Sequence, residues 1–227
     1  KKILIGNRKL MEENKIKLAS LEKKMQGLEE QGKTAMALVY SGEILGLIAV
    51  ADTLKEDSKE AIAELNKIGL RTVMITGDNE RTAMAIAKLS GIEDVIANVL
   101  PEEKENKVKE LQKQGMVAFV GDGINDAPAL KQSNVGIAMG TGTDIAIESG
   151  DIILARGNLM GVVSAIKLSR ATFKKIKQNL FWAFFYNLAA IPLAVLGLLH
   201  PIIAEIAMAS SSITVVTNAN LLRRKKI

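Results

Sequence analysis

Two carboxylates stand in a short glycine-rich stretch that could bind a phosphoryl group. The stretch is Gly121–Leu130, with the sequence Gly-Asp-Gly-Ile-Asn-Asp-Ala-Pro-Ala-Leu, and it follows the apolar run Met116–Val120, which predicts a buried strand. Asp122 is therefore expected at the carboxyl end of a strand, where open α/β sheets bind ligands. Asp122 and Asp126 offer the hard oxygen atoms that Mg²⁺ prefers, and the amide of Asn125 can orient such a ligand. The residues indicate magnesium-assisted handling of a phosphoryl group.

Two other interpretations of this stretch are possible. Gly-Asp-Gly alone is common turn chemistry, and Asn-Asp can simply begin a helix. A dinucleotide-binding fingerprint would need a third glycine, and Asp126 stands at that position. The complete ten-residue string favours the phosphoryl site over both alternatives.

Three more segments extend the pattern along the chain. They are Thr-Gly-Asp-Asn at Thr76–Asn79, Pro-Glu-Glu-Lys at Pro101–Lys104, and Ala-Met-Gly-Thr-Gly-Thr-Asp at Ala138–Asp144. Together with Gly121–Leu130 they resemble, in the same order, the motifs of P-type ATPases. These are cation pumps whose phosphorylation domain has the haloacid-dehalogenase-like fold. Four ordered segments are hard to explain by chance.

The resemblance implies roles for the residues of these segments. Thr76 would bind a phosphoryl oxygen through its hydroxyl and the adjacent Gly77 amide, while Asp78, like Asp52, would support the site or the hinge. Lys104 begins an expected helix, where a cation is unfavourable beside the positive end of the dipole. That local cost suits a lysine that reaches toward phosphate, although an ordinary solvated lysine is the alternative. Mg²⁺ would be bound by Asp122, with Asp126 and Asn125 completing the site.

The family's phosphorylated aspartate lies in the string Asp-Lys-Thr-Gly-Thr, which this sequence does not contain. The strand that carries it, normally central in the sheet, is also missing. Oxyanion stabilisers cannot replace a nucleophile. The chain alone is therefore expected to bind Mg²⁺ weakly and to form no acyl-phosphate.

Charge and hydropathy divide the chain into a polar part and an apolar part. Of its 227 residues, 48% are hydrophobic and 24% are charged, and the apolar residues gather in Leu180–Leu222. Basic residues border this region at Lys174–Lys177 and at Arg223–Lys226. This is the positive-inside pattern of a membrane hairpin with both ends in the cytoplasm. Nucleic-acid binding is disfavoured because aromatic residues are scarce in the polar part.

Strands alternating with helices after residue 47 predict a parallel, doubly wound sheet. The expected fold is α/β, a haloacid-dehalogenase-like sheet that is incomplete, with the tail of an α+β nucleotide-binding domain and a transmembrane hairpin. With no cysteine there is no disulfide and no thiolate metal site. Because the chain begins at Lys1 inside an expected strand, we interpret it as part of a longer protein. The expected organisation is the end of the nucleotide-binding domain at 1–46, the phosphorylation domain at 47–157, a linking helix at 158–179, membrane helices at 180–199 and 202–222, and a basic tail at 223–227.

ATP is implied as a ligand by the same resemblance. The segment Gly6-Asn7 matches a segment of heavy-metal members of the family in which a glycine packs near the adenine. Taken alone, Gly-Asn is only a turn signal.

The two apolar spans carry a few polar and sulfur side chains. Tyr186 and Asn187 lie in the first span, close to Pro192, which removes a backbone hydrogen bond and frees a carbonyl beside Asn187. Met208 and Ser212 lie in the second span, four residues apart and on one helix face. A thioether is a soft donor that suits Cu(I). Packing is the alternative role for methionine and serine in such helices.

This set of residues resembles the signature of copper(I)-transporting P-type ATPases, whose zinc and cadmium relatives carry an acidic-basic pair instead. The resemblance implies an enzyme, part of an ATP-driven copper(I) export pump that works through an aspartyl-phosphate, with Mg²⁺ and ATP as cofactors. It would be a multi-pass protein of the plasma membrane with cytoplasmic soluble domains. Its expected partners are the amino-terminal part of the same pump, membrane lipid and a copper chaperone.

Two alternatives stay open: a pump for Ag(I) or another soft metal, and a non-catalytic, membrane-anchored regulatory fragment. A soluble phosphatase is disfavoured by the hairpin. Glu205, one turn from Met208, could help to release the ion or could lie idle near the outer surface.

Overall fold

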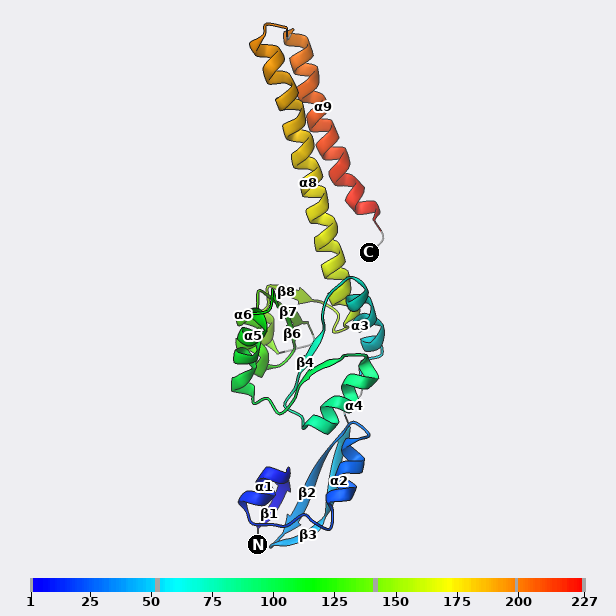
Figure 1. Cartoon of the computed structure of the whole chain (residues 1–227), viewed down its shortest axis with the longest axis vertical. Coiled ribbons are helices and arrows are strands. Elements are labelled where there is room, and N and C mark those ends of the chain that lie inside the picture. Colours follow the sequence, from blue (N-terminus) through cyan, green and yellow to red (C-terminus); the bar gives the residue numbers. More distant parts are fainter. Residues whose placement is uncertain (1, 52–53, 141–142, 199, 226–227) are drawn as a thin grey trace. The chain divides into compact units, whose positions relative to one another are not determined.

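The computed structural model describes residues 2–51, 54–140, 143–198 and 200–225 of the chain. Asp52 and the Thr141–Gly142 portion of the fourth motif lie outside these ranges. The chain divides into two compact units, Lys1–Val162 and Val163–Ile227 (Figure 1).

The first unit begins with a three-stranded antiparallel sheet in the order β1-β2-β3, accompanied by two helices. Its elements are β1 (Ile3–Gly6), α1 (Arg8–Glu13), α2 (Glu22–Glu29), β2 (Lys33–Tyr40) and β3 (Glu43–Ala51). Alternate residues of β2 are buried, as the two-residue period of a strand requires. They pack in a core with side chains of both helices: Met11, Met25, Ala35, Ala37 and Val39.

A tight hairpin joins β2 to β3. Ser41 has φ 49° and Gly42 has φ 90°, so both loop residues are left-handed, the conformation that matches the twist of a two-residue hairpin. β3 then continues without a break through residues 46 and 47, where a domain boundary was expected. The strand continues because its partner β2 remains paired along this whole stretch, with one register shift between Leu38 and Val39.

The rest of the first unit alternates short parallel strands with helices. β4 pairs in parallel with β5, and β6, β7 and β8 form a second parallel sheet in that order. No hydrogen-bonded pairing joins β4 to β6 in the described ranges, so this doubly wound sheet is interrupted. Its strands are β4 (Val73–Ile75), β5 (Asp94–Ile96), β6 (Ala118–Gly121), β7 (Val135–Met139) and β8 (Ile152–Leu154).

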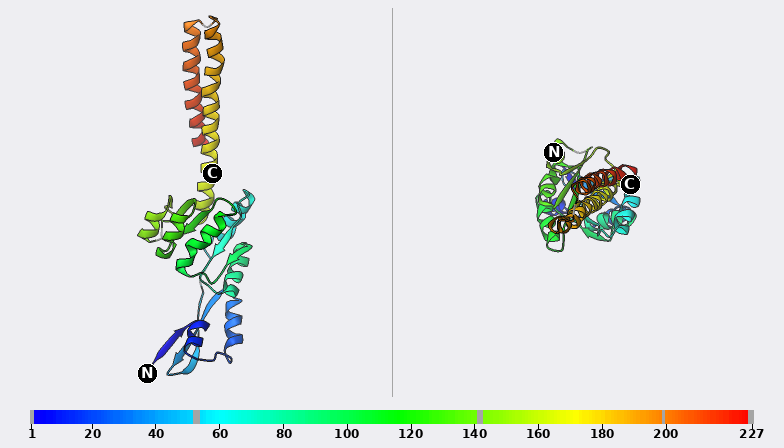
Figure 2. Two further views of the ribbon diagram at one scale, coloured as in Figure 1. Left: turned by 60° about the vertical axis from the view of Figure 1, so that its left-hand side comes forward. Right: turned by 90° about the horizontal axis from the view of Figure 1, so that it is seen from above.

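Helices and single turns connect these strands, and Figure 2 shows them in two further views. Asn79 caps the helix that follows β4, and Gly91 ends it with φ 83°. The helix expected to begin at Lys104 does so, and it is preceded by a 3₁₀ turn that starts at Pro101. The connecting elements are α3 (Ser58–Lys67), α4 (Glu80–Ser90), η1 (Pro101–Glu103), α5 (Lys104–Gln112), η2 (Ile124–Asp126), α6 (Ala127–Gln132) and α7 (Asp144–Ser149).

The second unit is formed by two long helices that lie side by side in both figures. They are α8 (Met160–Val195), whose first turn belongs to the first unit, and α9 (Pro201–Asn220), followed by η3 (Leu221–Arg224). The expected boundary at 179 and 180 falls inside α8, which continues because no glycine or proline lies between Gly161 and Pro192.

The turn between α8 and α9 follows the expected helix signals. Gly197, with φ 69°, ends the first helix, and His200 caps the second, in which Pro201 is the first residue. Among the described residues, one helix, Ile202–Arg224, is long and apolar enough to cross a membrane. The first predicted span, 180–199, stays a prediction.

Candidate functional site

The turn after β6 is built around the carboxylate of Asp126. One oxygen of Asp126 accepts hydrogen bonds from the backbone amides of Asp122 at 3.3 Å and Gly123 at 3.2 Å. A Cβ atom at Gly121 would stand 2.7 Å from the Cβ of Asp126, so a side chain there would displace the carboxylate. The sequence folds into this tight turn because glycine leaves room for Asp126 to bond the loop.

The other oxygen of Asp126 accepts a hydrogen bond from the ammonium of Lys104 at 2.8 Å. Both side chains are largely removed from solvent, with 12% exposure for Asp126 and 20% for Lys104. The structure therefore brings together two predicted site residues that are 22 positions apart. Asp126, predicted as a Mg²⁺ ligand, has both oxygens occupied by protein donors. Its observed contacts position the lysine and the loop.

Asp122 differs from Asp126 in its surroundings. Its side chain is exposed, as is that of Asn125, and neither side chain has a hydrogen bond or ion pair with another residue in the described part of the chain. A free carboxylate at the end of β6 fits a hard divalent cation. Within the same described ranges, no group of three or more His, Cys, Asp and Glu side chains could hold a metal ion. The protein thus offers Mg²⁺ one free anionic ligand here.

The second motif forms a compact loop at the end of β4. The hydroxyl of Thr76 donates to Asp78 at 2.9 Å, and the amide of Asp78 donates back to that hydroxyl at 3.1 Å. A Cβ atom at Gly77 would stand 3.3 Å from the carbonyl oxygen of Val99, so the loop lies close to the next segment of backbone. The amides of Thr76 and Asp78 are used within the fold, so the loop contains the amide of Gly77 and the hydroxyl of Thr76 as groups of the kind that bind phosphoryl oxygens.

The segment from Val99 to Lys104 connects the two loops. The amide of Val99 donates to the carbonyl of Thr76 at 3.0 Å, and Lys104, further along this segment, reaches Asp126. The carboxyl end of β4 and the carboxyl end of β6 are thereby linked through one short stretch. The residues predicted to form a phosphoryl-binding site lie on these linked segments.

Gly6 and Asn7, predicted beside the adenine, have structural roles in this fold. The side chain of Asn7 caps α1 by accepting from the amide of Leu10 at 3.1 Å. A side chain at Gly6 would collide with that of Leu10. Their contact with ATP stays a prediction.

Sequence reasoning missed an ion network in the antiparallel part of the first unit. Arg8 donates to the fully buried Glu29 at 2.5 Å and to Glu22 at 2.9 Å. These bonds hold the pKa of Glu22 below its usual value, and they raise the pKa of Arg8, with the Glu29 bond the largest cause. Glu22 and Glu29 stand 14 and 21 positions from Arg8, so no local sequence pattern indicated these ion pairs.

The four residues predicted to bind copper lie in the second unit. Met208 is 69% exposed, Asn187 and Ser212 are also exposed, and Tyr186 is half-buried. The amide group of Asn187 donates to the carbonyl of Ala183 at 2.8 Å, one turn earlier on α8. The two helices described here do not enclose a site at these side chains.

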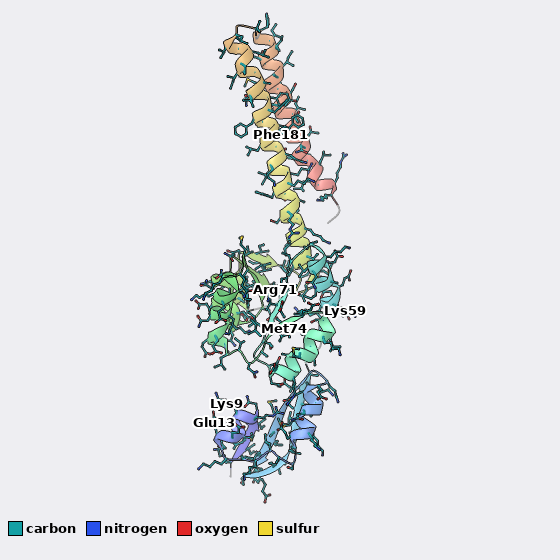
Figure 3. The ribbon with its side chains drawn as sticks, in the orientation of Figure 1. Lys9, Glu13, Lys59, Arg71, Met74 and Phe181 are labelled. Carbon is teal, nitrogen blue, oxygen red and sulfur yellow. The ribbon has the colours of Figure 1, made fainter. Side chains whose placement is uncertain are left out.

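Two other clusters shape the hairpin. The ring centroids of Trp182, Phe185 and Tyr186 lie 5.9–6.2 Å from one another along α8. The ring centroid of Phe181 lies 5.5 Å from that of Trp182. Figure 3 labels Phe181 on the hairpin. Near the other end of the hairpin, Asn218 of α9 accepts from Lys175 at 2.6 Å and donates to Asn179 at 2.7 Å. These hydrogen bonds join the two helices next to the predicted basic flank.

The comparisons with known proteins agree with this fold. A family model described as haloacid dehalogenase-like hydrolase matches residues 1–134, and a second model with the same description matches residues 103–166. The chain belongs to the haloacid dehalogenase-like hydrolase family. The predicted fold class is therefore confirmed.

Curated relatives place the chain more narrowly. It is 54% identical over 226 residues to a copper-exporting P-type ATPase of Staphylococcus haemolyticus, which covers 99% of this chain. It is 54% identical over 227 residues to a copper-exporting P-type ATPase of Bacillus subtilis, which covers all of it. The chain spans 28% of the length of each of these relatives. The predicted resemblance to heavy-metal P-type ATPases is confirmed.

Solved structures give the same result for the fold. A crystal structure of a zinc-transporting PIB-type ATPase in the E2.Pi state superposes with a TM-score of 0.79 and 38% identity, covering 97% of this chain and 36% of that one. Another crystal structure of a zinc-transporting PIB-type ATPase superposes with a TM-score of 0.76 and the same 38% identity, and 35% of that chain is covered. The fold of this chain is thus similar to that of a segment of these pumps.

Proposed function

We propose that this chain works as part of an ATP-driven copper(I) export pump. The observation that carries the proposal is the 54% identity to copper-exporting P-type ATPases along essentially the whole chain. Identity to the zinc-transporting pump is lower, at 38%. The amino-terminal part of the pump would supply the remaining membrane helices and the phosphorylated aspartate.

In this proposal the first unit holds the phosphoryl group while it passes from ATP to the aspartate. Catalysis of this kind depends on positioning and on neutralising charge. Thr76 and Gly77 bind phosphoryl oxygens, and Lys104 donates to them. An ammonium has three hydrogens, so Lys104 can keep its bond to Asp126 while it donates to phosphate. Asp126 thereby keeps the cation aimed at the site.

Mg²⁺ would be held by Asp122, with Asn125 beside it. When bound, the ion would neutralise phosphoryl charge. One carboxylate suffices because Mg²⁺ in such sites is bound by one or two carboxylates together with phosphate oxygens and water.

The nucleophile has a suitable place in this fold. β4 and β6 are separate edges of the two parallel sheets in the described ranges. A strand from the amino-terminal part, inserted between them, would bring its carboxyl end beside Thr76 and Asp122. Without that strand we expect the chain to show no Mg²⁺-dependent phosphoenzyme on incubation with labelled ATP.

In the membrane, Tyr186, Asn187, Met208 and Ser212 would take part in binding the copper ion. Three of these side chains are exposed on the hairpin, so helices of the amino-terminal part can complete the site around them. Soft thioether donation from Met208 favours Cu(I) and also accepts Ag(I).

The proposal is tested with the full-length protein in membranes. ATP hydrolysis is measured with Cu(I), Ag(I) and Zn²⁺ supplied separately under reducing conditions. We expect stimulation by Cu(I) and Ag(I) and none by Zn²⁺. Stimulation by Zn²⁺ without Cu(I) would overturn the choice of ion, and no stimulation by any metal would favour a regulatory fragment.

A further inference from the structure

Hydrogen bonds join the start of β2 to the loop that follows β4. The hydroxyl of Thr34 donates to one oxygen of Asp78 at 3.0 Å, and the hydroxyl of Thr76 donates to the other oxygen at 2.9 Å. The carboxylate of Asp78 is thus shared between a strand of the antiparallel sheet and the phosphoryl-binding loop. Thr34 stands 44 positions from Asp78 in the sequence.

A second contact fixes the same end of β2. Thr82, only 1% exposed, donates from its hydroxyl to the carbonyl of Lys33 at 3.1 Å. Asn79 caps α4 and donates to that hydroxyl at 3.0 Å. Lys33 and Thr34 are neighbours, so two successive residues of β2 are held by the loop and by the first turn of α4. The contact at Thr34 is therefore part of a built junction.

The position of the Thr76 hydroxyl depends on this junction. Its proton is donated to Asp78, and a phosphoryl oxygen would compete with Asp78 for it. The hydrogen bond from Thr34 to the other oxygen of Asp78 reduces the negative charge available to Thr76, and it thereby weakens the hydrogen bond from Thr76 to Asp78. The same donor also fixes the orientation of the carboxylate.

We propose that Thr34 is a positioning residue for the phosphoryl site, acting through Asp78 on the hydroxyl of Thr76. It rests on the proposed function, in which Thr76 binds the transferred phosphoryl group. Thr34 does not itself touch phosphate. The loop has its binding geometry when Thr34, at the start of β2, is hydrogen-bonded to Asp78. A movement of the nucleotide-binding part that breaks this bond would therefore change the position of the Thr76 hydroxyl.

The test uses the full-length pump with Thr34→Val, which keeps the shape of the side chain, and Thr34→Ser, which keeps the hydroxyl. Orthovanadate serves as the phosphoryl mimic, and its half-inhibiting concentration is measured in the metal-stimulated ATPase assay. We expect Thr34→Val to raise that concentration about fivefold, since a hydrogen bond to a charged group is lost, and Thr34→Ser to restore it within about twofold. The KM for ATP should change less than about twofold in both variants.

Two controls separate positioning from general packing. Thr72→Val removes a surface hydroxyl that bonds Asn66, and it should leave vanadate inhibition unchanged. Asp78→Asn should abolish the difference between Thr34→Val and wild type, because coupled residues are not additive. Thr34→Ala provides a second variant without the hydroxyl, and it should match Thr34→Val.

Unchanged vanadate inhibition in Thr34→Val and Thr34→Ala would overturn the role of Thr34. Equal weakening in Thr34→Ser would also overturn it, since the hydroxyl would then be irrelevant. Vanadate reports on the phosphoryl site, so the comparison can be made with whichever metal stimulates the pump. A failure of copper selectivity is therefore a different result from a failure of this inference.

Discussion

The same substitution at the two aspartates of the Gly121–Leu130 stretch should impair two different properties, stability for Asp126 and phosphorylation for Asp122. Asp126→Asn keeps the shape of the side chain but removes the charge that faces Lys104 at 2.8 Å and two backbone amides at 3.2 and 3.3 Å. An amide cannot offer acceptors to all three donors, because one of its two heavy atoms carries hydrogens. Lys104 or the loop is left without a partner.

The magnitude follows from the burial of the pair. Removing one partner of a fully buried ion pair costs about 3–5 kcal/mol, and a hydrogen bond to a charged group is worth about 1.5–3 kcal/mol. Because Lys104 and Asp126 retain 20% and 12% exposure, a loss of about 2–3 kcal/mol is expected for Asp126→Asn. For a unit of this size, that lowers the melting temperature by about 5–10 °C.

The assay is thermal unfolding of the purified chain in detergent, with Asp122→Asn as the matched control. Asp122 is exposed and its side chain has no partner among the described residues, so its variant should stay within about 0.5 kcal/mol of wild type. In the full-length pump at limiting Mg²⁺, Asp122→Asn should lower phosphorylation from ATP at least tenfold, about 1.4 kcal/mol in the barrier. A stable Asp126→Asn chain, or normal phosphorylation in Asp122→Asn, would refute the division of roles.

Three further predictions concern the membrane site, the core and pH. Met208→Leu removes the thioether, so Cu(I)-stimulated turnover should collapse, and it conserves volume, so stability should change by less than about 1.5 kcal/mol. Met84→Leu, in the first unit, should leave turnover normal. An active Met208→Leu pump would remove this residue from the site. Gly136→Ala would place a Cβ 2.7 Å from the carbonyl oxygen of Leu130 and should destabilise the chain by about 1–3 kcal/mol in thermal unfolding, while Gly115→Ala, which meets nothing within 4 Å, should not. The pKa of Glu22 is lowered by its bond from Arg8, so its stabilisation is present above the unfolded value of 4.5 and is lost as the pH falls through the folded value. Melting temperatures measured from about pH 6 to about pH 3.5 should therefore fall less in Glu22→Gln than in wild type, and parallel curves would contradict this.

Much of the local structure of the candidate site could be predicted because its signals are local. Gly121, Asp122 and Asp126 lie within one short stretch, and an apolar run ahead of them indicates the strand that they follow. The ends of α4 and of the β2–β3 hairpin were likewise marked by glycines with positive φ. In each case the backbone conformation is decided by residues next to one another.

Contacts across the fold could not be predicted in this way. Lys104 and Asp126 were each assigned to ligands, and their bond to each other depends on how α5 packs beside the β6 turn. Thr34 carried no signal, because a threonine in a strand is ordinary and its partner lies 44 positions away. Side-chain partners of this kind are set by tertiary packing, which no single-sequence pattern encodes.

The helix boundaries in the second unit show a different limit of prediction from the sequence. The change from basic to apolar residues near Leu180 marked the expected boundary between a linking helix and a membrane helix, but helix formation depends on the backbone and on side-chain propensity rather than on charge. α8 therefore continues across the change and ends only near Gly197. Composition marked where the chain turns apolar without indicating where the helix ends.

Copper transport itself is the central claim, and it is measured most directly in inside-out membrane vesicles that contain the full-length protein. With ATP and Cu(I) supplied outside, we predict ATP-dependent accumulation of copper in the vesicles, abolished by Met208→Leu and absent when Zn²⁺ replaces Cu(I). Accumulation of Zn²⁺ without copper, or copper accumulation that does not depend on ATP, would contradict the proposed function.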